Sequence, residues 1–278
     1  MIGLALIALA PATLFIWFFL HQARMDKSHK SLMWRTFFFG TLAIFPVLLV
    51  NYLLIYFFDF DIQTLLHTYS ISRNVLLILL GCFLIAIIEE YSKSIIVKEV
   101  DWNKKEFSRI VDGIEFSVAC GLGFALAENI YYFWTIYDMV LEINKDLMIA
   151  IVMRSTLSMM AHSVFSGIFG YYYGKARVLN LKYKRLNKIH RSYGFHLIHG
   201  LKIRLHRLKH LLNARNLHQE IEEQLHEKEL IAEGLLIAVI LHTLYNFFLT
   251  YGYSWIGVLL VAIEFYVILH EFRLHKND

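Results

Sequence analysis

The chain has 278 residues and a formal net charge of +4; 58% of its residues are apolar and only 18% are charged. Soluble domains carry roughly 25% charged and 45–50% apolar residues, so the composition argues against an ordinary soluble enzyme and indicates a membrane protein. The two cysteines, Cys82 and Cys120, lie in apolar stretches and indicate neither a disulfide framework nor a CxxC metal site.

Seven apolar stretches are long enough to cross the roughly 30 Å of hydrocarbon in a bilayer. They lie at about 2–20, 36–58, 75–97, 113–137, 147–174, 233–250 and 254–270. Nothing basic precedes the first stretch, and no small-residue cleavage site with a soluble domain follows it, so we do not expect a cleaved signal peptide. We predict an all-α, polytopic membrane helix bundle of about seven transmembrane helices, with 1–278 forming a single membrane domain.

Lysine and arginine are unevenly distributed over the connections between these stretches. Connections 21–35, 98–112, 175–232 and the C-terminal tail together hold 23 of them, whereas 59–74, 138–146 and 251–253 hold 2. Because basic residues favour the cytoplasmic side, this alternation predicts that the N-terminus lies outside and the C-terminus inside. We expect a multi-pass protein of the bacterial inner (cytoplasmic) cell membrane, with the lipid bilayer as its surroundings.

The segment 175–232 is the one sizeable soluble piece, between the fifth and sixth predicted spans. Leucines recur there at helical spacing with basic residues between them, at Leu201, Leu205, Leu208 and Leu212. We expect a cytoplasmic amphipathic helical insert that lies on anionic headgroups. Seven histidines, including His206 and His210, leave metal binding as an alternative, although no carboxylate or cysteine completes a ligand set. A basic stretch alone does not predict binding to nucleic acid.

Ionisable side chains occur inside the spans, where each costs on the order of 3 kcal/mol and usually faces the bundle interior. The stretch 75–97 contains Glu89, Glu90 and Lys93. Glu89 and Lys93 are four residues apart and can pair on one helix face, whereas Glu90 points about 100° further round. A carboxylate that accepts a proton beside one held as an acid suits the activation of water.

The next three spans add polar groups at similar depth. They are Glu128 and Asn129 in 113–137, a stripe of Arg154, Ser158, His162 and Ser166 in 147–174, and His242 with Asn246 in 233–250. At 1.5 Å per residue, the carboxylates and histidines fall within roughly a 10 Å slab around the bilayer midplane. Four spans can therefore converge on one site.

Each group also has a structural explanation when it is taken alone. Glu89 and Lys93 can form an ion pair that fixes helix register, and Arg154 can reach toward the interface. Glu128 and Asn129 can hydrogen-bond between helices, as can single buried histidines. The shared depth favours one functional site, because independent structural pairs have no reason to share it.

Four motifs follow one another across 75–250. They are Glu89-Glu90-x-x-Lys93, Phe124-x-x-x-Glu128-Asn129, His162 ahead of Phe165 and a Gly-Tyr-Tyr-Tyr-Gly run, and His242-x-x-Tyr245-Asn246. In order and spacing they resemble the PrsW family of intramembrane proteases. The resemblance implies membership of the wider group that includes CAAX prenyl endopeptidases and the APH-1 scaffold of γ-secretase. It also implies the family's role in stress signalling, cleavage of a membrane-anchored anti-sigma factor.

The resemblance implies catalytic roles for Glu89, Glu90 and His242, with a site completed by Glu128, Asn129, His162 and Asn246. Two features depart from the family's pattern. The last motif often ends in Asp, whereas this chain has Asn246, which removes one anionic group. The insert 175–232 is also longer than the family's usual connection, which leaves the identity of the substrate open.

We predict an intramembrane endopeptidase that uses activated water on a membrane-anchored protein. Glu89 or Glu90 takes a proton from water, and His242 with Asn246 stabilises the oxyanion. Lys93 holds one carboxylate ionised, while Glu128 and Asn129 position the water or the substrate backbone. We group His162 with the catalytic residues.

The cofactor is either none or zinc. In the metal variant, His162, His242 and Glu90 provide the ligands of an open zinc site. No HExxH motif is present, so the residues do not favour zinc. Two other classes stay open, an ion-coupled transporter and a non-catalytic scaffold, although no internal repeat supports the transporter. Oligomeric state does not follow from the sequence, and no nucleic-acid partner is expected.

Overall fold

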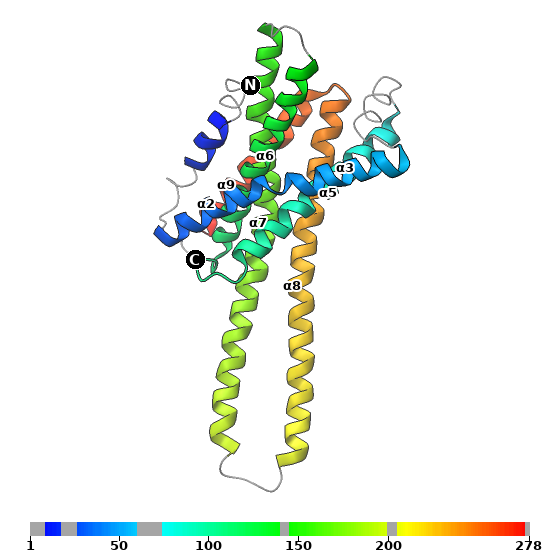
Figure 1. The fold of residues 1–278 in the computed structure, drawn as a ribbon. Coiled ribbons are helices and arrows are strands. Elements are labelled where there is room, and N and C mark those ends of the chain that lie inside the picture. Colours follow the sequence, from blue (N-terminus) through cyan, green and yellow to red (C-terminus); the bar gives the residue numbers. More distant parts are fainter. Residues whose placement is uncertain (1–8, 18–26, 60–73, 140–144, 199–204, 276–278) are drawn as a thin grey trace.

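The computed structural model describes residues 9–17, 27–59, 74–139, 145–198 and 205–275. The regular structure in these ranges is entirely helical, with no strand among them. Beyond residue 26 the helices are α2 Lys27–Thr41, α3 Ile44–Phe58, α5 Val75–Asp101, α6 Ile110–Met139, α7 Lys145–Ile198, α8 Leu205–Thr250 and α9 Ser254–Leu274. Figure 1 shows a bundle from which α7 and α8 extend together. The predicted all-α class is confirmed.

Five of the described helical segments are long and apolar enough to cross a membrane. They are Lys27–Phe57, Val75–Asp101, Ile110–Thr135, Gln224–Thr250 and Ser254–Leu274. Each matches a predicted stretch, so the polytopic membrane bundle is confirmed. The predicted stretch 2–20 lies partly outside the described residues, and 147–174 is helical within α7 without being among the five. The total of seven spans stays a prediction.

The connection predicted at 21–35 is shorter than expected, because α2 begins at Lys27. Its buried positions recur at helical spacing, and they include Leu32, Met33 and Phe37, whereas Lys30 and Arg35 are exposed. A search for uninterrupted apolar stretches misses a helix of this kind, because only one of its faces is apolar.

Close packing of α6 against α7 sets the positions of the site residues. A Cβ atom on Gly121 would lie 2.5 Å from the backbone oxygen of His162, so no larger residue fits there without a shift. Gly113 and Gly170 meet in the same way further along the two helices. Small residues allow such close approach between membrane helices. Because α5 packs against α8 as well, side chains from four helices reach one volume.

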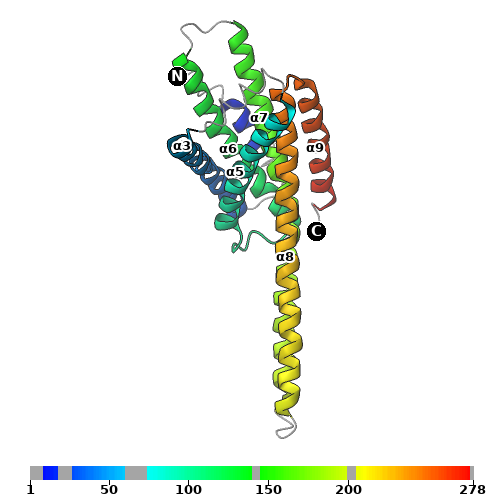
Figure 2. The same cartoon turned by 90° about the vertical axis from the view of Figure 1, so that its right-hand side faces the viewer.

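Helices α7 and α8 are much longer than a membrane span. They contain 54 and 46 residues, which correspond to about 80 and 70 Å at 1.5 Å per residue. Figures 1 and 2 show the hairpin they form continuing past the bundle in line with the helices inside it. At its base, Asn180 Nδ2 donates to Glu227 Oε2 at 2.5 Å.

The insert therefore projects away from the bundle, in line with its helices, and its contact with headgroups stays a prediction. No proline interrupts 175–198 to end the helix at the membrane surface. Residues 199–204 and the side chains of His206 and His210 lie outside the described part of the chain.

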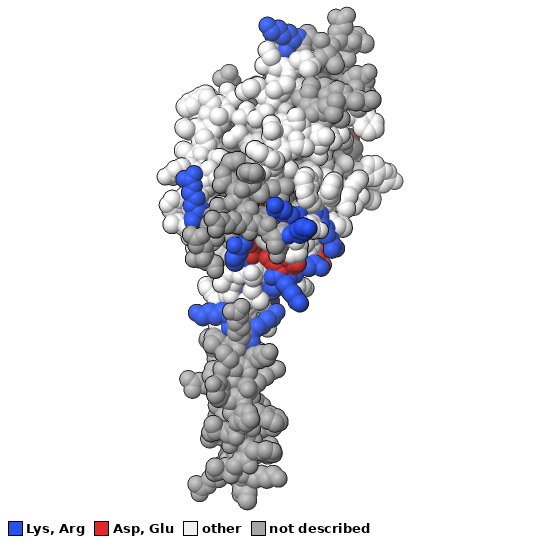
Figure 3. Space-filling model, turned by 90° about the vertical axis from the view of Figure 1, so that its left-hand side faces the viewer, with Lys and Arg blue, Asp and Glu red and all other residues white. Residues whose placement is uncertain are grey.

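Basic side chains gather at one end of the bundle. Figure 3 shows most of the lysine and arginine in view where the hairpin leaves the bundle, while the described surface above them is mainly uncharged. The connection between α5 and α6 and the start of the hairpin supply basic residues at this end, among them Lys104, Lys105 and Lys175. This distribution is the one expected if the hairpin side is cytoplasmic; the orientation itself stays a prediction.

Candidate active site

Four helices bring ionisable side chains together inside the bundle. Helix α5 contributes Glu89, Glu90 and Lys93, and single residues come from α6, α7 and α8, namely Glu128, His162 and His242. The contacts described below link these six residues, which we call the catalytic cluster. The sequence predicted all six as site residues.

Glu90 joins α5 to α8. Its Oε1 accepts a hydrogen bond from Lys93 Nζ at 2.6 Å and lies 2.8 Å from His242 Nδ1. All three side chains are at most 3% exposed. The sequence expectation paired Lys93 with Glu89, whereas the structure pairs it with Glu90, three residues away. Both spacings bring side chains together on a helix, and His242 supplies the further contact that distinguishes Glu90.

The hydrogen bond to Glu90 determines how His242 faces the cluster. A carboxylate oxygen accepts, so Nδ1 carries the proton and Nε2 carries the lone pair in the neutral ring. The ring stacks on Phe165 with centroids 4.9 Å apart. A histidine held in this way presents its second nitrogen in a fixed direction, as metal-binding and catalytic histidines do.

Within the catalytic cluster, Glu89 is the carboxylate that makes no hydrogen bond to a described residue. Its Oε2 is buried and has no hydrogen bond to any described residue. His242 Nε2 is 3.7 Å away, beyond hydrogen-bonding distance. With all three carboxylates ionised, Glu89, Glu90 and Glu128 face the two cationic side chains of Lys93 and Arg154, so one negative charge is left when both histidines are neutral. A proton, a water molecule or a cation next to Glu89 would satisfy that charge.

His162 links α5 to α6 through its two ring nitrogens. Lys93 Nζ donates to Nδ1 at 2.9 Å, and Nε2 donates to Glu128 Oε2 at 3.2 Å. The rings of His162 and His242 are nearly perpendicular, with centroids 5.2 Å apart. Contacts therefore continue across the whole cluster, from α8 through α5 and α7 to α6.

A divalent metal fits part of this cluster. Glu89, His162 and His242 each offer a ligand atom, and these atoms lie within 4.8 Å of one another. Two imidazoles and a carboxylate are ligand types that zinc accepts. His242 Nε2 and Glu89 Oε2 are available, while His162 would have to exchange one hydrogen bond. The sequence expectation placed Glu90 in this set, but the contacts of its Oε1 are taken by Lys93 and His242.

A second group of potential ligands, His29, Asp112 and Glu115, lies near the start of α6. Asp112 already accepts four hydrogen bonds, two from the backbone of 108–109 and two from the Arg109 side chain. His29 Nε2 lies 2.9 Å from Glu115 Oε2. These contacts cap α6 and fasten α2 to it, so a structural role accounts for them.

Two predicted site residues do not join the cluster. Asn129 is fully buried, yet neither of its amide atoms has a partner among the described residues. It follows Glu128 on α6 and therefore points about 100° away from it. Asn246 is half-buried one turn beyond His242, and its side chain takes part in none of the hydrogen bonds of the cluster.

Two residues outside the predicted site do join it. Arg154 Nη2 donates to Glu128 Oε1 and the Ser158 hydroxyl donates to Glu128 Oε2, each at 3.2 Å. The four-residue spacing that places both on one face of α7 with His162 was visible in the sequence. Their partner on α6 was not.

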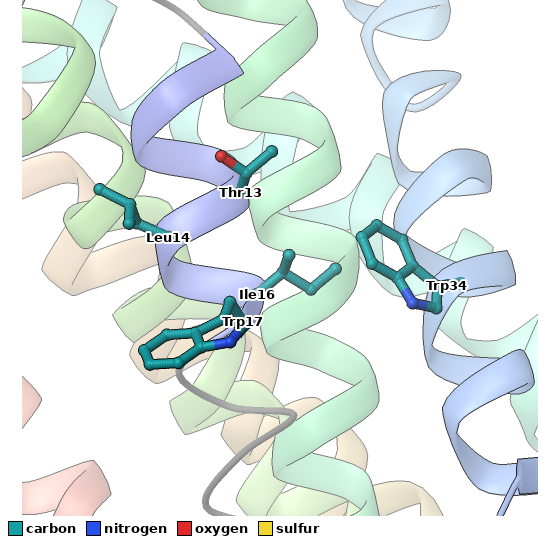
Figure 4. Close-up of a pocket in the computed structure, with 5 residues that line it drawn as sticks. All are labelled: Thr13, Leu14, Ile16, Trp17 and Trp34. Carbon is teal, nitrogen blue, oxygen red and sulfur yellow. The ribbon is translucent and has the colours of Figure 1, made fainter.

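A separate apolar pocket of about 550 Å³ lies between residues 9–17 and α2. Figure 4 shows the residues around it, Thr13, Leu14, Ile16, Trp17 and Trp34. The hydroxyl of Thr13 donates to its own helix, at Ala10 O. None of these five residues is ionisable, so the catalytic cluster remains the candidate active site among the described residues.

Comparison with known proteins gives the family. A family model described as PrsW family intramembrane metalloprotease matches residues 28–201. Protease PrsW of Geobacillus kaustophilus is 29% identical over 178 residues, 64% of this chain and 68% of that protein. For Oceanobacillus iheyensis the identity is 29% over 153 residues (55% and 60%), and for Clostridioides difficile 23% over 219 residues (78% and 71%). No solved structure matches the chain.

The matched range contains α5 and α6 with their carboxylates and the part of α7 that holds His162. His242, on α8, lies beyond the end of the matched range. The geometry thus adds the second histidine to the residues that the family model covers. Since the family model matches more than half of the sequence, the chain belongs to the PrsW family of intramembrane proteases.

Proposed function

We propose that this protein is an endopeptidase that hydrolyses a peptide bond in or next to the membrane span of a membrane-anchored protein. Membership of the family supports a protease, and the resemblance of the motifs favours an anti-sigma-factor-like substrate in the cytoplasmic membrane. The observation that carries the proposal is the buried, unpartnered Glu89 Oε2, 3.7 Å from the oriented His242 Nε2.

In the proposed reaction, water binds between Glu89 Oε2 and His242 Nε2. Glu89 accepts a proton as the water oxygen attacks the scissile carbonyl carbon, and His242 accepts the second hydrogen bond that orients the water. Lys93 is a buried cation of the cluster, and its charge would stabilise the tetrahedral oxyanion. When the C–N bond breaks, Glu89 returns the proton to the leaving nitrogen.

Glu89, His162 and His242 would hold a divalent metal, which when bound would polarise the scissile carbonyl and increase the acidity of a bound water. Glu90 keeps its orienting contact with His242, and Lys93 offsets the charge of Glu90. Burial of the cluster keeps other water out, which strengthens each of these electrostatic contacts.

A cleavage assay with the purified full-length protein tests the proposal. Single-span membrane peptides are incubated in detergent with the wild type and with Glu89→Gln. We expect the substitution to lower kcat at least about 100-fold, because general-base catalysis contributes roughly 10²–10⁴-fold. Glu264→Gln is the matched control, since Glu264 is another buried carboxylate, lies on α9, and has no partner among the described residues.

Equal turnover by Glu89→Gln and the wild type would overturn the proposal. A chelator arm separates the two chemistries: activity lost to chelation and restored by zinc assigns Glu89, His162 and His242 to metal binding. Activity that survives chelation assigns the water step to the carboxylate alone. Absence of cleavage in every arm, together with proton-driven uptake in proteoliposomes, would favour a transporter.

A further inference from the structure

Most described side chains of the catalytic cluster and its immediate partners are buried. The more exposed ones lie together at one place. The side chains of Glu128 and Arg154 are 24% and 34% exposed, whereas those of Glu89, Glu90, Lys93, His162 and His242 are 2–7% exposed. Tyr132 is 37% exposed, and the Arg154 guanidinium lies over its ring, 3.9 Å from the centroid. We call Glu128, Tyr132, Arg154 and Ser158 the mouth of the cluster.

The mouth lies toward the end of the bundle opposite the hairpin. Arg154 is nine residues from the start of α7 at Lys145 and 23 residues before Arg177, which bonds to Phe107 O where the hairpin leaves the bundle, or about 14 and 35 Å along the helix. Figure 1 shows the start of α7 at the end of the bundle opposite the hairpin. A substrate that enters through the mouth therefore meets the cluster from the half of the membrane opposite the hairpin.

The mouth has hydrogen-bonding capacity to spare. Arg154 Nε is buried and has no partner in the part of the chain that the structure describes. A guanidinium carries five N–H donors in one plane, so Arg154 can keep its 3.2 Å contact with Glu128 Oε1 and donate to a further acceptor. The Glu128 carboxylate has about four acceptor sites and can receive another N–H.

A membrane-spanning substrate needs such groups. Its scissile bond lies in a helix, where each C=O and N–H is bonded to a residue four positions away. Cleavage requires local unwinding, and each backbone group freed in the hydrocarbon costs several kcal/mol unless it finds a partner. The mouth offers a donor and an acceptor next to His162, whose Nε2 is 3.2 Å from Glu128 Oε2.

We propose that Arg154 and Glu128 form a binding subsite for the unwound backbone of the substrate. Arg154 donates to a backbone carbonyl, and Glu128 accepts from a backbone N–H, beside the scissile bond. The inference rests on the proposed endopeptidase function and specifies the class of its substrate: a membrane span that unwinds in the half of the bilayer opposite the hairpin. Because the subsite binds backbone atoms, it selects substrates by how readily they unwind.

The test is a double-substitution cycle between the enzyme and the substrate backbone. Single-span peptides are synthesised with one amide replaced by an ester at successive positions around the cut, which removes an N–H and weakens a carbonyl acceptor. Values of kcat/KM are measured with full-length wild type, Arg154→Gln and Arg154→Lys. Arg109→Gln is the matched control, because the Arg109 side chain is 37% exposed and pairs with Asp112 at the other end of the bundle.

With the wild type and Arg109→Gln, we expect an ester at one position to lower kcat/KM about tenfold, the effect of losing a hydrogen bond to a charged group. With Arg154→Gln, the same ester should cause no further loss, because the charged donor that bonds to the weakened carbonyl is already absent. Such non-additivity reports direct contact, which a merely structural ion pair would not produce. If the glutamine variant is too unstable to assay, Arg154→Lys is measured in its place, and it should retain part of the coupling.

Ester effects that are the same in the wild type and Arg154→Gln at every position would overturn the inference while leaving cleavage, and so the proposed function, intact. The same cycle is measured as peptide Kd in the Glu89→Gln background, where no turnover is needed. Failure of the wild type to cleave any peptide counts against the proposed function, and a Kd unaffected by Arg154→Gln counts against the subsite.

Discussion

Lys93 makes three contacts that define the charge at the centre of the catalytic cluster. Its ammonium group lies 2.6 Å from Glu90 Oε1 and 2.9 Å from His162 Nδ1, and 4.6 Å from the ring centroid of Phe124. Water is largely excluded, so the pair of Lys93 and Glu90 is stable only while both charges are present. Lys93 thus packs α5 against its neighbours and contacts His162 directly, and it also binds Glu90, the carboxylate that orients His242.

Removing one charge of this pair should separate the two roles. We expect Glu90→Gln to lower the free energy of unfolding by about 3–5 kcal/mol, because Lys93 is left buried and unpaired. The double variant Glu90→Gln/Lys93→Met should recover most of that stability but not the cleavage activity, since His242 still lacks its carboxylate. Thermal unfolding and peptide cleavage are the two measurements. Recovery of activity together with stability would contradict an orienting role for Glu90.

Helices α6 and α7 carry opposite sides of the cluster, and their separation is set where glycine replaces a side chain. At Gly121 a Cβ atom would meet both the His162 backbone oxygen and Ser166 Oγ, each at 2.5 Å. Gly257 on α9 is different, because a Cβ atom there would find its nearest neighbour at 3.5 Å, an ordinary contact. The two positions form a matched pair of glycines in membrane helices.

Gly121→Ala should therefore push α7 away from α6 and lengthen the 3.2 Å contact between His162 and Glu128. We expect overpacking to cost about 1–3 kcal/mol of stability, and kcat to fall because the cluster is misplaced. Gly257→Ala should change stability by no more than about 1 kcal/mol and leave kcat as it is. Unfolding in mixed detergent and the cleavage assay measure both. An active, stable Gly121→Ala would show that the helices can adjust.

At the scale of the molecule, the described residues form a bundle that contains the catalytic cluster and a hairpin that leaves it. Every cluster contact described above joins residues between Glu89 and His242 within the bundle. The hairpin meets the bundle near Asn180 and Glu227, whose side chains are joined by a hydrogen bond. Beyond that bond, α7 and α8 continue side by side away from the site (Figures 1 and 2).

Shortening the hairpin should spare the chemistry. Replacing 185–223 by a connector of about five Gly/Ser residues, which spans at most roughly 16–18 Å, joins α7 and α8 just beyond the contact of Asn180 with Glu227. Because no cluster contact involves the removed segment, kcat for a single-span peptide should stay within about twofold, which is within 0.4 kcal/mol. A large loss of kcat in a shortened protein with unchanged thermal unfolding would place the hairpin in the reaction. Full-length protein is the reference.

Apolar length and residue spacing by themselves determined the class of this protein and most of its candidate site. Uninterrupted apolar stretches predict membrane helices because hydrocarbon excludes unpaired backbone groups, and five of the predicted stretches are described as such helices. Ionisable residues inside them identified all six members of the cluster, because burying a charge is costly without a function. The order of the motifs indicated the family before any geometry was known.

Only the tertiary structure decided which of these residues are partners. Spacing allowed Lys93 to pair with either glutamate, and the approach of His242 from α8 selected Glu90 and left Glu89 unpartnered. The same packing joined Arg154 to Glu128 and left Asn129 outside the cluster. Such contacts depend on how helices distant in sequence pack together, whereas local spacing reports only which residues share a face of their own helix.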